Sequence, residues 1–139
     1  MRGIILGIIF ISLSVGRCSG KISVSPVVVE ALNAKRGDSF EIHCSQWGDR
    51  PVDVLLSLAL FDQDKEGKVL FLEDELSVQK AHSLLAVDSE RFCLGAQEER
   101  VITAKLVGEP TTSTYVVLFI KPLQAGISTR LSVLFLLSP

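Results

Sequence analysis

Residues 89–107 constrain the fold more than any other part of the sequence. Phe92 and Leu94 alternate with Arg91 and Cys93, so this segment presents two apolar side chains on one face of a short strand. A turn-forming segment, GAQE, follows it, and the β-rich run VITAKLV then forms a longer strand. A strand–turn–strand unit with one apolar face is not stable alone. The remaining chain must therefore supply strands that cover this face.

Most of the remaining chain carries the same pattern of strands and turns. In the clearest strand, Phe40, Ile42 and Cys44 alternate with polar side chains. Leucine and alanine favour a helix in residues 52–61, but the β-branched start of this segment and the break at Pro51 favour a strand. Further strands are expected at residues 21–32, 113–121 and 127–137, with a short apolar run at 69–72.

Two features interrupt this pattern. Pro26 stands within the first expected strand, where a proline favours a sheet edge or a switch between sheets. Residues 73–86 form the one convincing helical segment, with acidic side chains in the first turn. The residues that can line one side of this helix are Leu76, Ala81, Leu84 and Leu85. We expect a short helix that crosses between two sheets.

The spacing of the strands predicts the fold class. About seven to eight strands with turns roughly every eight to twelve residues are the sequence signature of an immunoglobulin-like sandwich. The chain has 139 residues, which suits one domain. We therefore predict an all-β immunoglobulin-like β-sandwich with one short crossing helix, formed by residues 21–139 as a single domain.

The first 20 residues have the build of a secretory signal peptide. Arg2 precedes an uncharged apolar run at residues 3–16, and small residues follow it. This run is short for a membrane span, which needs about 20 apolar residues, although an uncleaved anchor is the alternative. Cys18 suggests a lipid-attachment site, but Arg17 stands where such a site has a small residue. We expect cleavage and export to the periplasm or another extracytoplasmic, secreted location.

The charge of the mature chain limits its partners. Without Arg2 and Arg17, 12 of the 14 basic side chains remain beside 16 acidic ones, which gives a formal charge of −4. This balance argues against nucleic acid and anionic membranes as partners. We expect contact with a membrane only if the N-terminal segment is retained or Cys18 is lipidated. We expect no cofactor, because no Cys/His spacing suggests a metal site.

Export also raises the question of a disulfide between Cys44 and Cys93. The alternation of side chains places Cys44 on the inward face of its strand and Cys93 on the outward face of another. A bridge needs the two Cβ atoms about 4 Å apart and facing each other. The sequence leaves two outcomes open: a disulfide, or one buried and one exposed thiol.

Residues 62–73 contain the sharpest local motif. Asp62, Asp64, Glu66 and Glu73 stand at the first, third, fifth and twelfth positions of a calcium-loop spacing, with Gly67 at the sixth. Glu66 is long for its position, and the preceding segment reads as a strand rather than as the entering helix of such a site. We therefore interpret the motif as a polar hairpin loop and expect no metal there.

The order and spacing of the segments resemble the N-terminal immunoglobulin-like domain of bacterial periplasmic pilus-assembly chaperones. The segment SERFCLGA resembles the family's pattern of proline or serine, two residues, Phe, any residue, Leu and then proline or glycine. The segment LFIKP resembles its penultimate strand with the closing proline. The matching segments, in chain order, are 25–29, 37–42, 89–96, 101–106, 118–122 and 130–135.

The resemblance implies a way of binding proteins. In this family, the last strand lends alternate apolar side chains to an incomplete client domain. The residues that can do so here are Leu134 and Leu136, or else Val133 and Phe135.

The sequence also departs from the family in its charged residues. The chaperones hold the terminal carboxylate of a pilus subunit with two basic residues. The corresponding positions here fall near Val29 or Glu30 and at Ser132, and none of these residues is basic. The resemblance therefore implies the fold, but not the binding of a terminal carboxylate.

These observations predict a non-enzymatic exported protein-binding domain, similar to a periplasmic chaperone, that binds a protein of the cell envelope through a sheet edge or its last strand. The alternative is a structural or interaction module of the cell surface without chaperone activity. An enzyme is disfavoured because no cluster of nucleophile, base and metal ligands stands out.

Overall fold

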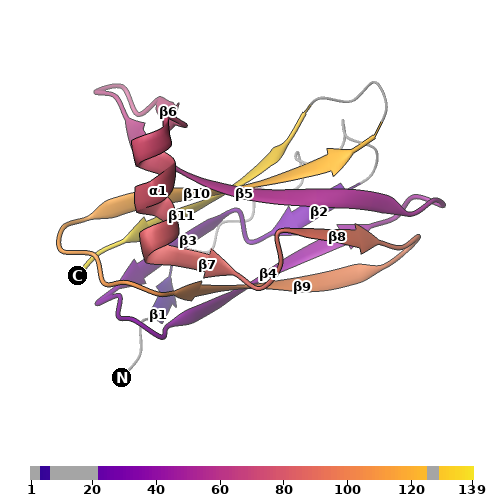
Figure 1. The fold of residues 1–139 in the computed structure, drawn as a ribbon, viewed down its shortest axis with the longest axis horizontal. Coiled ribbons are helices and arrows are strands. Elements are labelled where there is room, and N and C mark those ends of the chain that lie inside the picture. Colours follow the sequence, from indigo (N-terminus) through magenta and orange to yellow (C-terminus); the bar gives the residue numbers. More distant parts are fainter. Residues whose placement is uncertain (1–3, 7–21, 125–128) are drawn as a thin grey trace.

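The computed structural model describes residues 4–6, 22–124 and 129–139. They form a β-sandwich with one short helix, as the sequence predicts (Figure 1). The strands are β1 (Ile4–Leu6), β2 (Ile22–Ser25), β3 (Val28–Leu32), β4 (Ser39–Gln46), β5 (Val52–Gln63), β6 (Val69–Leu72), β7 (Leu85–Val87), β8 (Arg91–Leu94), β9 (Glu99–Leu106), β10 (Thr114–Leu123) and β11 (Leu131–Leu137), and the helix is α1 (Glu75–Leu84).

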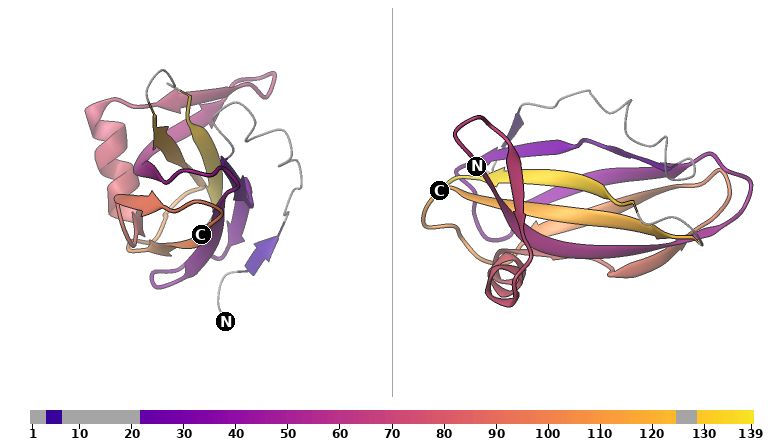
Figure 2. Two further views of the ribbon diagram at one scale, coloured as in Figure 1. Left: turned by 90° about the vertical axis from the view of Figure 1, so that its right-hand side faces the viewer. Right: turned by 90° about the horizontal axis from the view of Figure 1, so that it is seen from above.

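The strands form two sheets that lie face to face (Figure 2). The larger sheet has seven strands in the order β1-β3-β11-β10-β5-β6, and β8 pairs with the same edge of β5 as β6 does, further toward its start. The smaller sheet has four strands in the order β2-β4-β9-β7. The strand count exceeds the expected seven to eight because the expected first strand is divided into β2 and β3, the end of the expected helical segment contributes β7, and β1 is added.

Pro26 marks a switch between the two sheets. The expected first strand is divided there into β2, which pairs with β4 in the small sheet, and β3, which runs parallel to β11 in the large sheet. The other edge of β3 pairs with β1, which lies within the predicted signal peptide. The rest of that peptide, including Cys18, lies outside the described residues, so its cleavage stays a prediction.

Residues 89–107 form a strand, a turn and a strand, as expected. The two strands do not pair with each other, however, because β8 pairs with β5 and β9 pairs with β4. The turn between them therefore crosses from one sheet to the other. The buried side chain of Gln46 fixes this crossing, since its Nε2 donates to the carbonyl oxygens of Leu94 and Gly95 at 2.9 Å each.

Helix α1 crosses from β6 in the large sheet to β7 in the small sheet (Figure 1). Its N-cap is Asp74, whose carboxylate accepts a hydrogen bond from the backbone N–H of Ser77. The helix ends at Leu84, earlier than expected, because the next three residues pair with β9. The expected inward position of Leu76 is wrong, since this side chain is 76% exposed, whereas Ala81 and Leu84 are buried.

The core between the sheets is built from alternating side chains of both layers. Phe135 from β11 contacts Phe40 from β4 across the interface, with ring centroids 5.9 Å apart. Both rings are almost fully buried. The strand predicted at residues 52–61 is confirmed. The side chains of this strand that pack into the core are Val52, Val54, Leu56, Leu58 and Leu60.

We expect Phe135→Ala to lower the free energy of unfolding by about 3–5 kcal/mol, because it leaves a cavity between the sheets. Trp47→Ala is the control: Trp47 lies in a loop and is 48% exposed, so the change should stay near 0.5 kcal/mol. Urea unfolding followed by circular dichroism measures both. Equal losses in the two variants would contradict this account of the core.

Candidate functional site

The predicted partner-binding residues lie on β11, which is an inner strand of the large sheet, between β10 and β3. Val133 and Phe135 are fully buried between the two sheets. Leu134 and Leu136 lie on the outer face of the large sheet and are half-buried. Of the two pairs named in the sequence analysis, only Leu134 and Leu136 are partly accessible to solvent.

Leu134 and Leu136 belong to a second apolar cluster on the outer face of the large sheet. Its buried members are Ala59, Phe61, Val117 and Phe119, and its partly buried members are Val69, Val78, Tyr115, Leu134 and Leu136. The rings of Phe61 and Tyr115 are stacked at a centroid distance of 5.3 Å. Helix α1 contributes Val78. The outer face is therefore partly covered by the chain's own side chains.

Arg130 covers one end of this cluster. Its guanidinium lies 3.6 Å from the centroid of the Phe119 ring and donates to both carboxylate oxygens of Glu73, at 3.0 and 2.7 Å. Phe71 meets Phe119 edge to face at 5.0 Å. The hydrogen bonds from Arg130 lower the pKa of Glu73 below its usual value. Sequence reasoning missed this ion pair, because nothing in the spacing links residues so far apart.

β3 covers only the second half of the β11 edge that faces it. The register pairs Leu134 with Val28, and the backbone N–H of Leu134 donates to the carbonyl of Val27 at 2.9 Å. Among the described residues, no strand pairs with residues 131–133 on this side. Backbone groups alternate along a strand, so the N–H and C=O of Ser132, like those of Leu134, point toward this side.

The positions matched to the chaperones' basic anchors hold no substitute cation. Val29 is buried in the core. Glu30 is half-buried and stands beside Leu136 in the register between β3 and β11. Arg130 lies two residues before Ser132, but its guanidinium is bound by Glu73.

Cys44 and Cys93 are both free, which is the second of the two outcomes that the sequence left open. Cys44 lies in β4 of the small sheet with its side chain in the core, whereas Cys93 lies in β8 of the large sheet and is exposed. Burial raises the pKa of the Cys44 thiol to about 12. The alternation of side chains in the sequence had indicated this arrangement of one buried and one exposed thiol.

The acids of the calcium-loop motif have other partners. Asp64 Oδ1 accepts hydrogen bonds from the backbone N–H groups of Glu66 and Lys68, at 2.9 and 2.8 Å, and so closes the turn between β5 and β6. Glu73 binds Arg130. In the described part of the chain, no group of three or more Asp, Glu, His or Cys side chains is placed to hold a metal ion. Asp62 is exposed at the end of β5.

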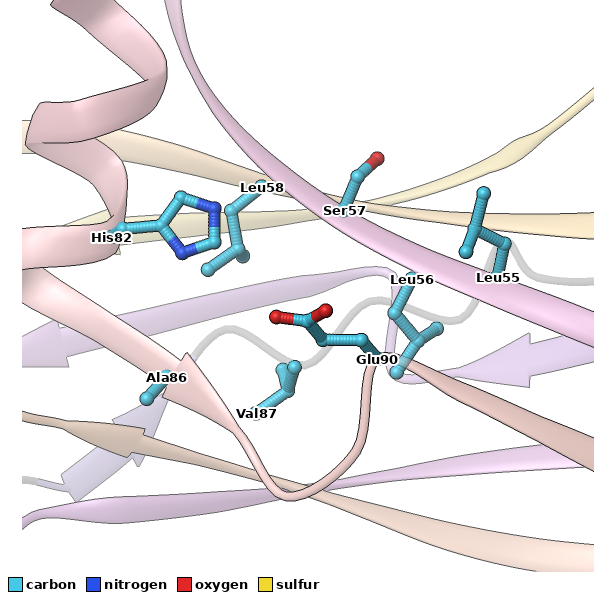
Figure 3. Close-up of a pocket in the computed structure, with 8 residues that line it drawn as sticks. All are labelled: Leu55, Leu56, Ser57, Leu58, His82, Ala86, Val87 and Glu90. Atoms are coloured by element: carbon cyan, nitrogen blue, oxygen red, sulfur yellow. The ribbon is translucent and has the colours of Figure 1, made fainter.

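A pocket of about 360 Å³ lies beside β5, on the side of the sandwich that helix α1 crosses (Figure 3). It lies at the middle of this edge of β5, which no described strand covers, since β8 pairs with the first part of the edge and β6 with the last part. Its lining residues are Leu55, Leu56, Ser57, Leu58, His82, Ala86, Val87 and Glu90. Sequence reasoning missed this pocket, because side-chain alternation does not show where a neighbouring strand ends.

The single helix among the described residues is too short and too polar to cross a membrane.

Solved structures with a similar fold include bacterial chaperones. The class 5 fimbriae chaperone CfaA is 10% identical, with a TM-score of 0.67, over 86% of this chain and 56% of that one. A chain of the CsuC–CsuE complex of chaperone and tip adhesion subunit from Acinetobacter baumannii is 13% identical, with a TM-score of 0.61, over 85% and 56%. The fold is similar to that of pilus-assembly chaperones. The fold resemblance inferred from the sequence is thus confirmed.

The same fold occurs outside pilus assembly. A PapD-like domain of human CEP192 is 11% identical, with a TM-score of 0.54, over 86% of this chain and 84% of that one. No protein-family model matches the sequence, and no curated protein matches it significantly. The chain spans 56% of the length of each bacterial chain above, so the activity of a whole chaperone does not follow from the fold.

We expect a thiol reagent to label Cys93 in the native protein and Cys44 only after unfolding. Cys93 is exposed, whereas burial and a pKa raised to about 12 keep Cys44 as an inaccessible thiol. Peptide mass spectrometry after labelling at mildly alkaline pH locates each label and distinguishes Cys18. A cross-linked peptide containing Cys44 and Cys93, or rapid native labelling of Cys44, would contradict this arrangement.

Proposed function

We propose that the chain is an exported, non-enzymatic protein-binding domain that takes up an extended segment of a cell-envelope protein at the edge of β11. The observation that carries the proposal is the part of this edge at residues 131–133 that β3 does not cover. An extended partner segment adds to such an edge through backbone hydrogen bonds, and side-chain contacts then give specificity. Ser132 would supply the backbone groups, and Leu134 the nearest apolar side chain on the outer face.

The fold similarity supports a protein as the partner. Solved neighbours include chaperones in complex with a tip adhesion subunit or a pilin. Export with loss of residues 1–20 would remove β1 and leave β3 as the outermost strand of the large sheet, with its pairing to β11 unchanged. If the chain is exported, its location is the periplasm or another extracytoplasmic compartment.

The alternative is an interaction module of the cell surface that does not assist folding. The lack of a basic residue at Val29, Glu30 and Ser132 favours this alternative. So does the packing of Leu134 and Leu136 into the chain's own outer cluster, since a donor strand has to release these side chains to its client. A chaperone and a surface module both require partner binding, but only a chaperone would also rescue an unfolded client.

We expect Ser132→Pro to reduce capture of the partner by roughly five- to tenfold, because it removes a backbone donor from the open edge of β11. Ser132→Thr is the matched control, since it keeps the N–H and adds one methyl group. Proline is tolerated best where the missing N–H faces outward, so the pairing of β11 with β10 should persist. The measurement is affinity capture from the native cell envelope, with circular dichroism of each variant.

Equal capture by both Ser132 variants would place binding elsewhere and end the proposal for this edge. A double variant, Leu134→Asp with Leu136→Asp, then tests the outer face separately. Rescue of a denatured client by the wild-type chain, measured as recovered client activity, distinguishes a chaperone from a surface module.

A further inference from the structure

The middle of β5 has a gap along one edge. β8 pairs with residues 52–55 of this strand, and β6 pairs with residues 60–63. The backbone N–H of Leu56 still reaches the carbonyl of Glu90 at 2.8 Å. Among the described residues, no strand pairs with residues 57–59 on this side. The pocket described above occupies this gap.

The gap exposes backbone groups of one residue in particular. The N–H of Leu56 points toward the gap, and N–H and C=O groups alternate in direction along a strand. The N–H and C=O of Leu58 therefore point into the gap as well. The pocket wall thus offers a backbone donor and a backbone acceptor.

The side chains around this gap combine apolar walls with one carboxylate. Leu55, Leu58 and Val87 supply apolar surface. The side chain of Glu90 extends over the pocket toward His82 of helix α1 (Figure 3). The ion pairs formed by the described residues do not include Glu90, and the neighbouring Arg91 binds Asp53 instead, at 3.2 Å. A negative charge without a cationic partner therefore lies over an apolar hollow.

We propose that this pocket binds an arginine side chain carried by an extended peptide segment. The aliphatic stem of an arginine packs on leucine and valine walls, while its planar guanidinium donates several hydrogen bonds at once. The carboxylate of Glu90 and the carbonyl of Leu58 supply acceptors for these donors. The backbone N–H of Leu58 can pair with a carbonyl of the same peptide. A volume of about 360 Å³ lies within the range of small ligand sites.

This site is independent of the function proposed above. In the large sheet, β10 separates β5 from β11, and the pocket opens on the side crossed by helix α1. A partner bound at the open edge of β11 would not reach it. Failure of one proposal therefore leaves the other standing.

The test is a titration of the isotope-labelled full chain with two tripeptides, followed by NMR. One peptide is acetyl-Val-Arg-Val-amide, and the other carries citrulline, which has nearly the same shape but no charge. We expect a roughly millimolar dissociation constant for the arginine peptide, with shifts centred on Leu58, His82 and Glu90. The citrulline peptide should bind at least about fivefold more weakly, because it loses the charge-assisted hydrogen bonds.

Two variants of equal charge locate the contact. Glu90→Gln should weaken binding of the arginine peptide to the level of the citrulline peptide. Glu66→Gln is the matched control, since Glu66 is exposed on the loop after β5, outside the pocket lining. This substitution should leave the affinity for the arginine peptide unchanged.

Three results would overturn the proposal: equal affinity for the two peptides, equal loss in the two variants, or shifts centred away from Leu58. The comparison of the peptides uses the unaltered chain, so it decides the matter even if Glu90→Gln does not fold.

Discussion

Both faces of β10 are buried, and much of the structure follows from the need to cover them. Val116, Leu118 and Ile120 face the small sheet, whereas Val117 and Phe119 lie on the outer face, all at most 2% exposed. β5 and β11 satisfy the backbone on either side. The small sheet covers the inner face. Aromatic rings, one helix residue and an arginine bound to a glutamate cover the outer face, which is therefore not a bare apolar surface.

Side-chain alternation predicted which way the strands face, but not which strands are neighbours. It placed Cys44 inside and Cys93 outside, it identified residues 52–61 as a strand, and Pro26 indicated the switch between sheets. It could not show that the strands on either side of the 95–98 turn belong to different sheets, because pairing depends on contacts between distant residues. Leu76 fits an apolar helix face, but its side chain is exposed in the first turn of the helix.

The same limit applies to the candidate sites. The resemblance singled out the last strand for partner binding, and β11 is an inner strand whose first residues no described strand covers on the side of β3. The sequence therefore led to the strand on which the proposed binding edge lies, but not to the backbone groups of that edge. The gap beside β5 had no sequence signature, since it depends on where β6 and β8 end. Where a strand lacks a neighbour depends on how the strands pair in three dimensions.

The buried side chain of Gln46 helps to hold the crossover between the sheets where β8 leads into β9. Gln46 donates from its amide to the carbonyls of Leu94 and Gly95, and its backbone N–H donates to the carbonyl of Glu98 at 2.9 Å. A leucine would fill the space but leave both carbonyls unpaired, and a glutamate would set acceptors against acceptors. An inserted residue would carry these carbonyls out of reach. The length of this loop and the glutamine at position 46 therefore depend on each other.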